Sequence, residues 1–335
     1  VAARPYDVVT EAEARAQAKG KPWSFLHVSR AEIDCPPGTD AHDSLVYATA
    51  AAAFARMQAD AVLVREAAPA LYAYRMTAGG HVQTGLAAAA SIDAYEHNRM
   101  RRHEHTRPDK ERDRTRQIAA VGAHTGPVLV AHPHDEVVQR ALTTATAAAP
   151  IADAMTVEGT RHQVWAVTEP AAIAALVAAF AAMPAIYIAD GHHRSAAAAR
   201  LVREGRARAA DARFLIVSFP ADQLKILDYN RVVRDLAGLT PEAFLERIST
   251  AFTVSPAPGL CRPEGRGAFT MFLDGQWYRL GLKQPPDPAL SARERLDVSL
   301  LYDRMLAPVL GIGDPRTDPR IDFVGGGRGL AALEE

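Results

Sequence analysis

Five consecutive residues, Asp190 to Arg194, combine the side chains that phosphate sites use. They read Asp-Gly-His-His-Arg and separate a short apolar run, 185–189, from an Ala-rich stretch, 195–203. A strand–loop–helix junction of this kind can bind an anion, because the helix N-terminus carries unpaired N–H groups and a positive partial charge. Gly191 lets the backbone approach a phosphate closely, and Arg194 can bind two of its oxygens. The pattern predicts a phosphate site; the alternative is a capped helix with exposed histidines.

The histidines and the aspartate extend this prediction. His192 and His193 can donate hydrogen bonds to phosphate or exchange protons near neutral pH, and His192 is a candidate catalytic residue. Asp190 can orient a histidine or bind Mg²⁺.

The elements that must position these residues are a mixture of strands and helices. The mixture predicts an α/β (α+β) fold with a mixed sheet, divided into segments 1–90, 91–240 and 241–335. Helices are predicted from Thr10 as N-cap to Gly20, from Asp40 or Asp43 to Asp60, after Thr106, and over 168–183, 195–203, 241–252 and 297–310. Strands are predicted over 71–76, 83–91, 128–131, 185–189, 213–219, 224–229, 268–273 and 276–282.

Composition limits the partners. The chain has 335 residues, a net charge of −1 and two cysteines. We therefore expect no nucleic-acid or membrane partner and a reducing, cytoplasmic location. The order of residues around His103, His105, His192 and His193 does not match a zinc motif, so no zinc is expected. Neither a P-loop nor a Rossmann glycine fingerprint is present.

A resemblance to a known family refines the phosphate site. The segment from Ile188 to Ala198 resembles the phosphate-binding box of the ParB/sulfiredoxin superfamily, whose members bind CTP, ATP or ADP there. Over nearly its whole length the chain is similar to a bacterial and archaeal family within that superfamily, catalogued as a domain of unknown function and related to free serine kinase. The shared markers are 5–8, 103–111, 113–115, 190–194 and 314–324.

The resemblance also separates chemistries. Sulfiredoxin has a nucleophilic cysteine where this chain has His192, and ParB proteins need a DNA-binding module that we do not find. The resemblance therefore implies a ParB/sulfiredoxin-like nucleotide-binding core and a kinase that transfers a phosphoryl group from ATP, ADP or CTP, with Mg²⁺, to free serine or a similar hydroxy compound. Two alternatives stay open: a nucleotide-dependent switch, and a phosphohydrolase using His192 or His193. A homodimer is a further expectation.

A second cluster, beginning at His103, supplies what such a kinase needs. The reaction requires a carboxylate that accepts the hydroxyl proton, and cations that stabilise the transferred phosphoryl group. By analogy with free serine kinase, Glu104 is the predicted base, with His103 beside it. Arg107, Lys110 and Arg114 can share one face of a helix and bind phosphate. The alternative is a solvated, salt-bridged helix, and the sequence does not say whether 103–117 and 190–194 meet.

Three more residues are candidates for substrate binding. Asn230 and Arg231 follow a predicted strand and can reach a nucleotide or substrate; equally, they can be a strand end with a solvated arginine. Asp7 can bind a substrate amine or cap a turn.

Overall fold

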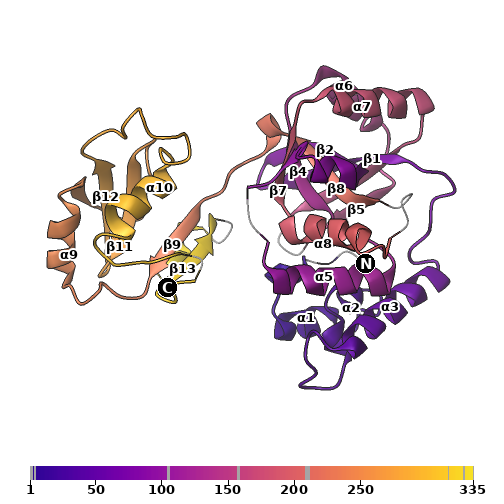
Figure 1. The fold of residues 1–335 in the computed structure, drawn as a ribbon, viewed down its shortest axis with the longest axis horizontal. Helices are drawn as coiled ribbons and strands as arrows, with labels where there is room; N and C mark the ends of the chain where they lie inside the picture. Colours follow the sequence, from indigo (N-terminus) through magenta and orange to yellow (C-terminus); the bar gives the residue numbers. More distant parts are fainter. Residues whose placement is uncertain are drawn as a thin grey trace. The chain divides into compact units, whose positions relative to one another are not determined.

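A large mixed sheet organises the first part of the chain (Figure 1). The computed structural model describes residues 3, 5–103, 106–156, 159–207, 212–315, 317–326 and 329–334, without the side chain of Asp7. Contacts divide the chain into two compact units, Val1–Leu224 and Lys225–Glu335. Strands from both sides of residue 90 belong to the large sheet, so the predicted segments 1–90 and 91–240 share one sheet. The three-segment division itself stays a prediction.

In the first unit, the described strands form a sheet in the order β3-β7-β4-β8-β2-β1-β6-β5, with parallel and antiparallel pairs. The strands are β1 Leu71–Ala78, β2 His81–Ser91, β3 Met100–Arg101, β4 Val128–His132, β5 Ala152–Met155, β6 Arg161–Val167, β7 Ile186–Asp190 and β8 Arg213–Pro220. The helices are α1 Glu11–Ala18, α2 Leu26–Ser29, α3 Ser44–Ala59, α4 Ile92–Glu96, α5 Pro108–Val121, α6 Glu136–Ala145, α7 Pro170–Ala182 and α8 His192–Arg203, with 3-10 turns η1 Tyr6–Val8, η2 Ala31–Asp34 and η4 Ala221–Gln223.

One face of the sheet carries four of these helices. The pairing register places Ala73 opposite Leu86 and Val130 opposite Ile188 on this face, with Ser218 of β8 between the two pairs. Helices α6 and α7 pack over the Ala73 end, and α4 and α8 pack over the Ile188 end. The alternation of side chains in a strand explains why every second residue is buried here.

Helix α8 also supports a second helical layer. Ser195 and the four alanines 196–199 are all buried, and their small side chains let α8 lie close to the sheet. Helix α5 packs against α8, and α3 packs against α5. Thr10 and Glu13 form the predicted capping box of α1, and Asp43 caps α3. These helix starts are therefore confirmed.

A fully buried histidine lies at the end of β4. His132 Nδ1 lies 2.8 Å from the Ser218 hydroxyl oxygen, and its ring lies 5.1 Å from that of Phe180. Burial disfavours the charged imidazolium and lowers the pKa of His132 to about 4.

The second unit contains two small sheets, β10-β12-β11 and β13-β9, in the described residues. Its strands are β9 Tyr229–Val233, β10 Phe252–Ala257, β11 Ala268–Leu273, β12 Gln276–Leu282 and β13 Ile321–Gly325; its helices are α9 Pro241–Ile248, α10 Asp297–Leu301, the π-helix η5 Tyr302–Leu306 and the 3-10 turn η7 Leu330–Leu333. Asp274 and Gly275 both have positive φ at the turn between β11 and β12. The predicted hairpin is confirmed.

Three local predictions in this unit are wrong. The helix predicted over 241–252 ends at Ile248, and Phe252 begins β10. Residues 224–228 do not form a strand; the strand begins at Tyr229 and pairs with β13, near the end of the chain. Asp297 is the first residue of its helix, after Leu296 as N-cap. Residues 224–228 read Leu-Lys-Ile-Leu-Asp, and the three apolar residues suggested a strand, but the Ile226 side chain is exposed.

The mixed α/β class predicted from the sequence is confirmed. Within the part of the chain that the structure describes, no helix has both the length and the apolar character needed to cross a membrane.

The buried imidazole makes stability depend on pH. Above about pH 6.5 both folded and unfolded chains hold His132 neutral; as the pH falls toward 4, the unfolded chain binds a proton and the folded chain does not. We expect the wild-type free energy of unfolding to fall by about 2–3 kcal/mol more than that of His132→Asn between about pH 7.5 and about pH 4.5. Urea unfolding of both proteins at the two pH values measures this. An equal fall in both would contradict it.

Candidate functional site

The predicted phosphate segment forms the start of α8. Asp190 is the last residue of β7, Gly191 is the N-cap with φ +92°, and His192 is the first helical residue. The expectation that 190–194 is a loop before a helix at Ser195 is therefore wrong at both ends, because only Gly191 separates the strand from the helix. The three residues His192 to Arg194 form the first helical turn, where the positive end of the helix dipole lies.

Two contacts hold Arg194 in place. Its Nη2 donates to Asp190 Oδ2 at 2.5 Å, one turn before it, and its Nη1 donates to the carbonyl oxygen of Pro127 at 2.5 Å. The arginine side chain is 17% exposed, whereas that of Asp190 is 65% exposed. The guanidinium is therefore fixed at the base of the helix start rather than extended into solvent.

The two candidate clusters meet. The backbone N–H of Arg107, the N-cap of α5, donates to His193 Nε2 at 3.1 Å. The rings of His103 and His192 lie edge to face with centroids 4.5 Å apart. His193 therefore has its proton on Nδ1 when it is neutral, since Nε2 accepts. The starts of α5 and α8 thus lie side by side.

The cations of α5 have different surroundings. The Arg107 guanidinium pairs with Asp109 in its own turn at 2.8 Å, and Lys110 is exposed. Arg114, two turns along α5 from Arg107, is only 14% exposed and lies against Asp113. Arg107 and Lys110 are therefore exposed near the helix start, whereas Arg114 is largely buried, so the three side chains do not share one environment.

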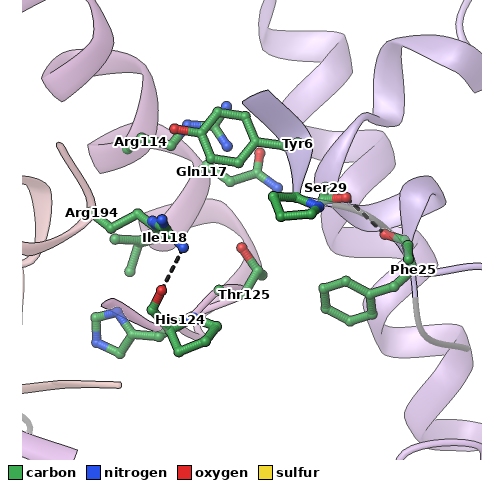
Figure 2. Close-up of a pocket in the computed structure, with 13 residues that line it drawn as sticks. Tyr6, Phe25, Ser29, Arg114, Gln117, Ile118, His124, Thr125 and Arg194 are labelled. Carbon is green, nitrogen blue, oxygen red and sulfur yellow. Dashed lines mark hydrogen bonds between the residues drawn. The ribbon is translucent and has the colours of Figure 1, made fainter. Parts of the chain in front are cut away.

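A small cavity opens beside Arg194. Its volume is about 160 Å³, and Arg194 from α8 and Arg114 from α5 both line it (Figure 2). The Arg114 guanidinium lies over the ring of Tyr6, 4.0 Å from its centroid. Figure 2 also shows the Gln117 side chain near this pair. His124 and Thr125, from the loop before β4, complete much of the wall.

A hydrogen-bonded group behind the cavity fixes Arg114. Asp113 Oδ2 accepts from Arg114 Nε and Nη2, while Oδ1 accepts from the Tyr47 hydroxyl at 2.7 Å and lies 3.1 Å from His42 Nδ1. Burial opposes ionisation of Asp113, but the Arg114 charge and these hydrogen bonds hold its pKa below the usual range. Burial and the Asp113 contact raise the pKa of Tyr47 to about 12. The aspartate is therefore ionised and the tyrosine is a neutral donor near pH 7.

The remaining predicted residues lie elsewhere or are not described. Glu104 lies outside the described residues, and Asp7 lies in η1 without a described side chain. Asn230 and Arg231 belong to β9 of the second unit, where Arg231 lies over the rings of Tyr229 and Phe323. No group of three His, Cys, Asp or Glu side chains that could hold a metal ion occurs among the residues with described positions.

Sequence reasoning missed much of the cavity wall. The loop Ala123 to Pro127, which combines polar residues with Gly and Pro just before a strand, was a usable signal. Gln117 of the wall and Tyr47, which contacts Asp113 behind it, lie inside helices, and no local pattern distinguishes them from other helical residues. Burial lowers the pKa of His124, so this wall residue is neutral near pH 7.

The comparisons with known proteins give one match. A family model described as "Protein of unknown function (DUF1015)" matches residues 1–299. Neither the curated proteins nor the solved structures contain a match to the chain.

Gly191 should tolerate no side chain without moving Arg194. An added Cβ would lie 2.9 Å from Arg194 Nε, and the positive φ of +92° costs a non-glycine residue about 1–2 kcal/mol. We expect Gly191→Ala to lose stability by about this amount and also to weaken pyrophosphate binding by about tenfold or more. Calorimetric titration and urea unfolding measure the two effects.

Gly205→Ala is the matched control, since Gly205 follows the other end of α8. Its φ is +65°, and an added Cβ would have no neighbour within 4 Å. It should lose similar stability and keep pyrophosphate affinity; equal loss of affinity in both variants would contradict the role of Arg194.

Proposed function

Since the chain belongs to the family described as "Protein of unknown function (DUF1015)", we propose its function from the site: a nucleotide-dependent kinase that phosphorylates a small hydroxy compound such as free serine. One observation carries this proposal. The starts of α5 and α8 meet, and Arg194 from the start of α8 lines a small cavity together with Arg114 of α5.

The phosphate end of the nucleotide binds at the start of α8. The helix dipole and the Arg194 guanidinium both favour negative charge there. The Arg107 backbone N–H donates to His193 Nε2, and this contact fixes the imidazole beside the start of α8. Arg107 and Lys110 add two exposed positive charges at the adjacent start of α5. Together these groups favour a polyphosphate, which carries several charges within a few ångströms.

Magnesium fits the donor set. Asp190 has a 65% exposed carboxylate, of which only Oδ2 bonds to Arg194. A Mg²⁺ ion that arrives with nucleotide phosphates needs only one or two protein carboxylates. When bound, Mg²⁺ neutralises charge on the phosphates. We propose Asp190 as its protein ligand and ATP, ADP or CTP as the nucleotide.

Glu104 is the proposed general base. It follows His103 directly in the chain, and the contact of His103 with His192 supports its assignment to this site. Glu104 accepts the proton of the acceptor hydroxyl, whose oxygen forms a bond to the terminal phosphorus. The bond from that phosphorus to the bridging oxygen breaks, and the shortened nucleotide leaves with Arg194 stabilising the charge.

Arg194→Ala should weaken nucleotide binding. Loss of charge-assisted hydrogen bonds to phosphate costs about 1.5–3 kcal/mol, or roughly 10–150-fold in Kd. Calorimetric titration with ATP, ADP and CTP measures the loss. Arg203→Ala, on the same helix but with a largely exposed side chain facing Glu96 and Glu111, is the control and should leave Kd unchanged.

Glu104→Gln should spare nucleotide binding and lower turnover. Loss of a general base reduces the rate by about 10²–10⁴-fold. The assay follows phosphoserine formed from L-serine, Mg²⁺ and each nucleotide. If the wild-type protein forms no phosphoserine with any nucleotide, the kinase proposal is rejected.

Two further results would then identify the alternatives. Nucleotide-dependent changes in oligomer size without phosphoryl transfer would indicate a switch, and phosphate release from phosphoserine alone would indicate a phosphohydrolase.

A further inference from the structure

We propose that the cavity beside Arg194 binds the phosphoryl acceptor and that Arg114 binds a carboxylate group on that acceptor. The proposal rests on the proposed kinase function, and it names the chemical class of the acceptor: a small hydroxy acid rather than a simple alcohol or amino alcohol.

The size of the cavity selects a small ligand. Its volume is about 160 Å³. An engineered protein cavity of about 150 Å³ binds benzene, which has six heavy atoms. A hydroxy acid with three or so carbons fits such a space, and a purine nucleoside is far too large for it. The nucleotide base therefore lies outside the cavity, and only the terminal phosphate approaches it at Arg194.

Arg114 has the geometry of a carboxylate receptor. Its Nε and Nη2 both donate to Asp113 Oδ2, whereas no hydrogen bond within the described residues involves Nη1. The ring of Tyr6 covers one face of the guanidinium and fixes its plane. A planar guanidinium held in this way binds a carboxylate directionally. The Arg114 side chain also lines the cavity, and we therefore assign it to a ligand bound there.

The position of Arg114 along α5 separates it from the phosphate end. Arg107 contacts His193 at the helix start, and Arg114 lies seven residues further, roughly 10 Å along the axis. The sequence predicted that both arginines bind phosphate. In this proposal Arg107 lies at the phosphate end, and Arg114 lies beside the acceptor. A hydroxy acid held by Arg114 presents its other end toward Arg194.

Tyr47 and Asp113 are positioning residues for this receptor. The Tyr47 hydroxyl donates to Asp113 Oδ1, and the other oxygen of the same carboxylate holds Arg114. Because Tyr47 belongs to α3 and Arg114 to α5, this connection ties the guanidinium to the outer helical layer. Neither Tyr47 nor Asp113 needs to touch the ligand.

The experiment compares two acceptors that differ by one carboxylate group. L-serine carries a carboxylate and ethanolamine does not, but both carry a hydroxyl and an amine. Binding of each is measured by calorimetric titration, without turnover, and kcat and KM by phosphoryl transfer. In the wild type we expect L-serine to bind about 10–100-fold more tightly than ethanolamine. In Arg114→Gln this preference should disappear, with the nucleotide Kd unchanged.

Tyr47→Phe gives a second, milder variant if Arg114→Gln fails to fold. It should raise KM for L-serine several-fold, leave kcat within about twofold and leave ethanolamine unaffected. Tyr187→Phe, at an exposed tyrosine of β7 outside the cavity wall, is its control and should match the wild type.

The outcomes separate the two proposals. Arg114-dependent binding of L-serine without phosphorylation supports Arg114 as a carboxylate receptor and rejects the kinase. Phosphorylation of ethanolamine as efficiently as L-serine supports the kinase and overturns the carboxylate receptor. Equal losses for both acceptors in Arg114→Gln, or a weakened nucleotide Kd, would also overturn it.

Discussion

The close approach of α8 to its neighbours is the constraint on which the candidate site depends. Ser195 and the alanines 196–199 are buried on several sides of the helix, between the sheet and α5. Interiors are packed at near-crystalline density, so the size of these side chains sets the distance between α5 and α8. Larger residues would separate the two helix starts, and Arg107 would no longer reach His193.

Both arginines of the cavity are held before any ligand arrives. Arg194 pairs with Asp190 one helical turn away, and Arg114 pairs with its neighbour Asp113. Each pairing partly compensates the positive charge, so net attraction for anions is smaller than two free guanidinium groups would give. The N–H donors, however, are already oriented. A ligand therefore does not have to order these long side chains, and such ordering is a main cost of binding. This arrangement favours discrimination between ligands over raw affinity.

The same junction is supported from the far side of the helices. Glu111 of α5 faces Arg200 and Arg203 of α8 at 3.8 and 3.9 Å. Such partly exposed pairs contribute little stability individually. They join the same two helices whose starts meet at His193.

Local sequence determined much of this protein. The capping box at Thr10, the hairpin at Asp274, the helix beginning at Pro108 and the strand before Asp190 follow from short-range rules, because caps, turns and alternation act over a few residues. The segment Asp190 to Arg194 was recognisable as a candidate phosphate site for the same reason. Tertiary structure decided what lies beside it: the meeting of α5 with α8, the burial of Arg114, and the roles of Tyr6 and Tyr47. These depend on contacts between residues tens of positions apart, which no local pattern encodes.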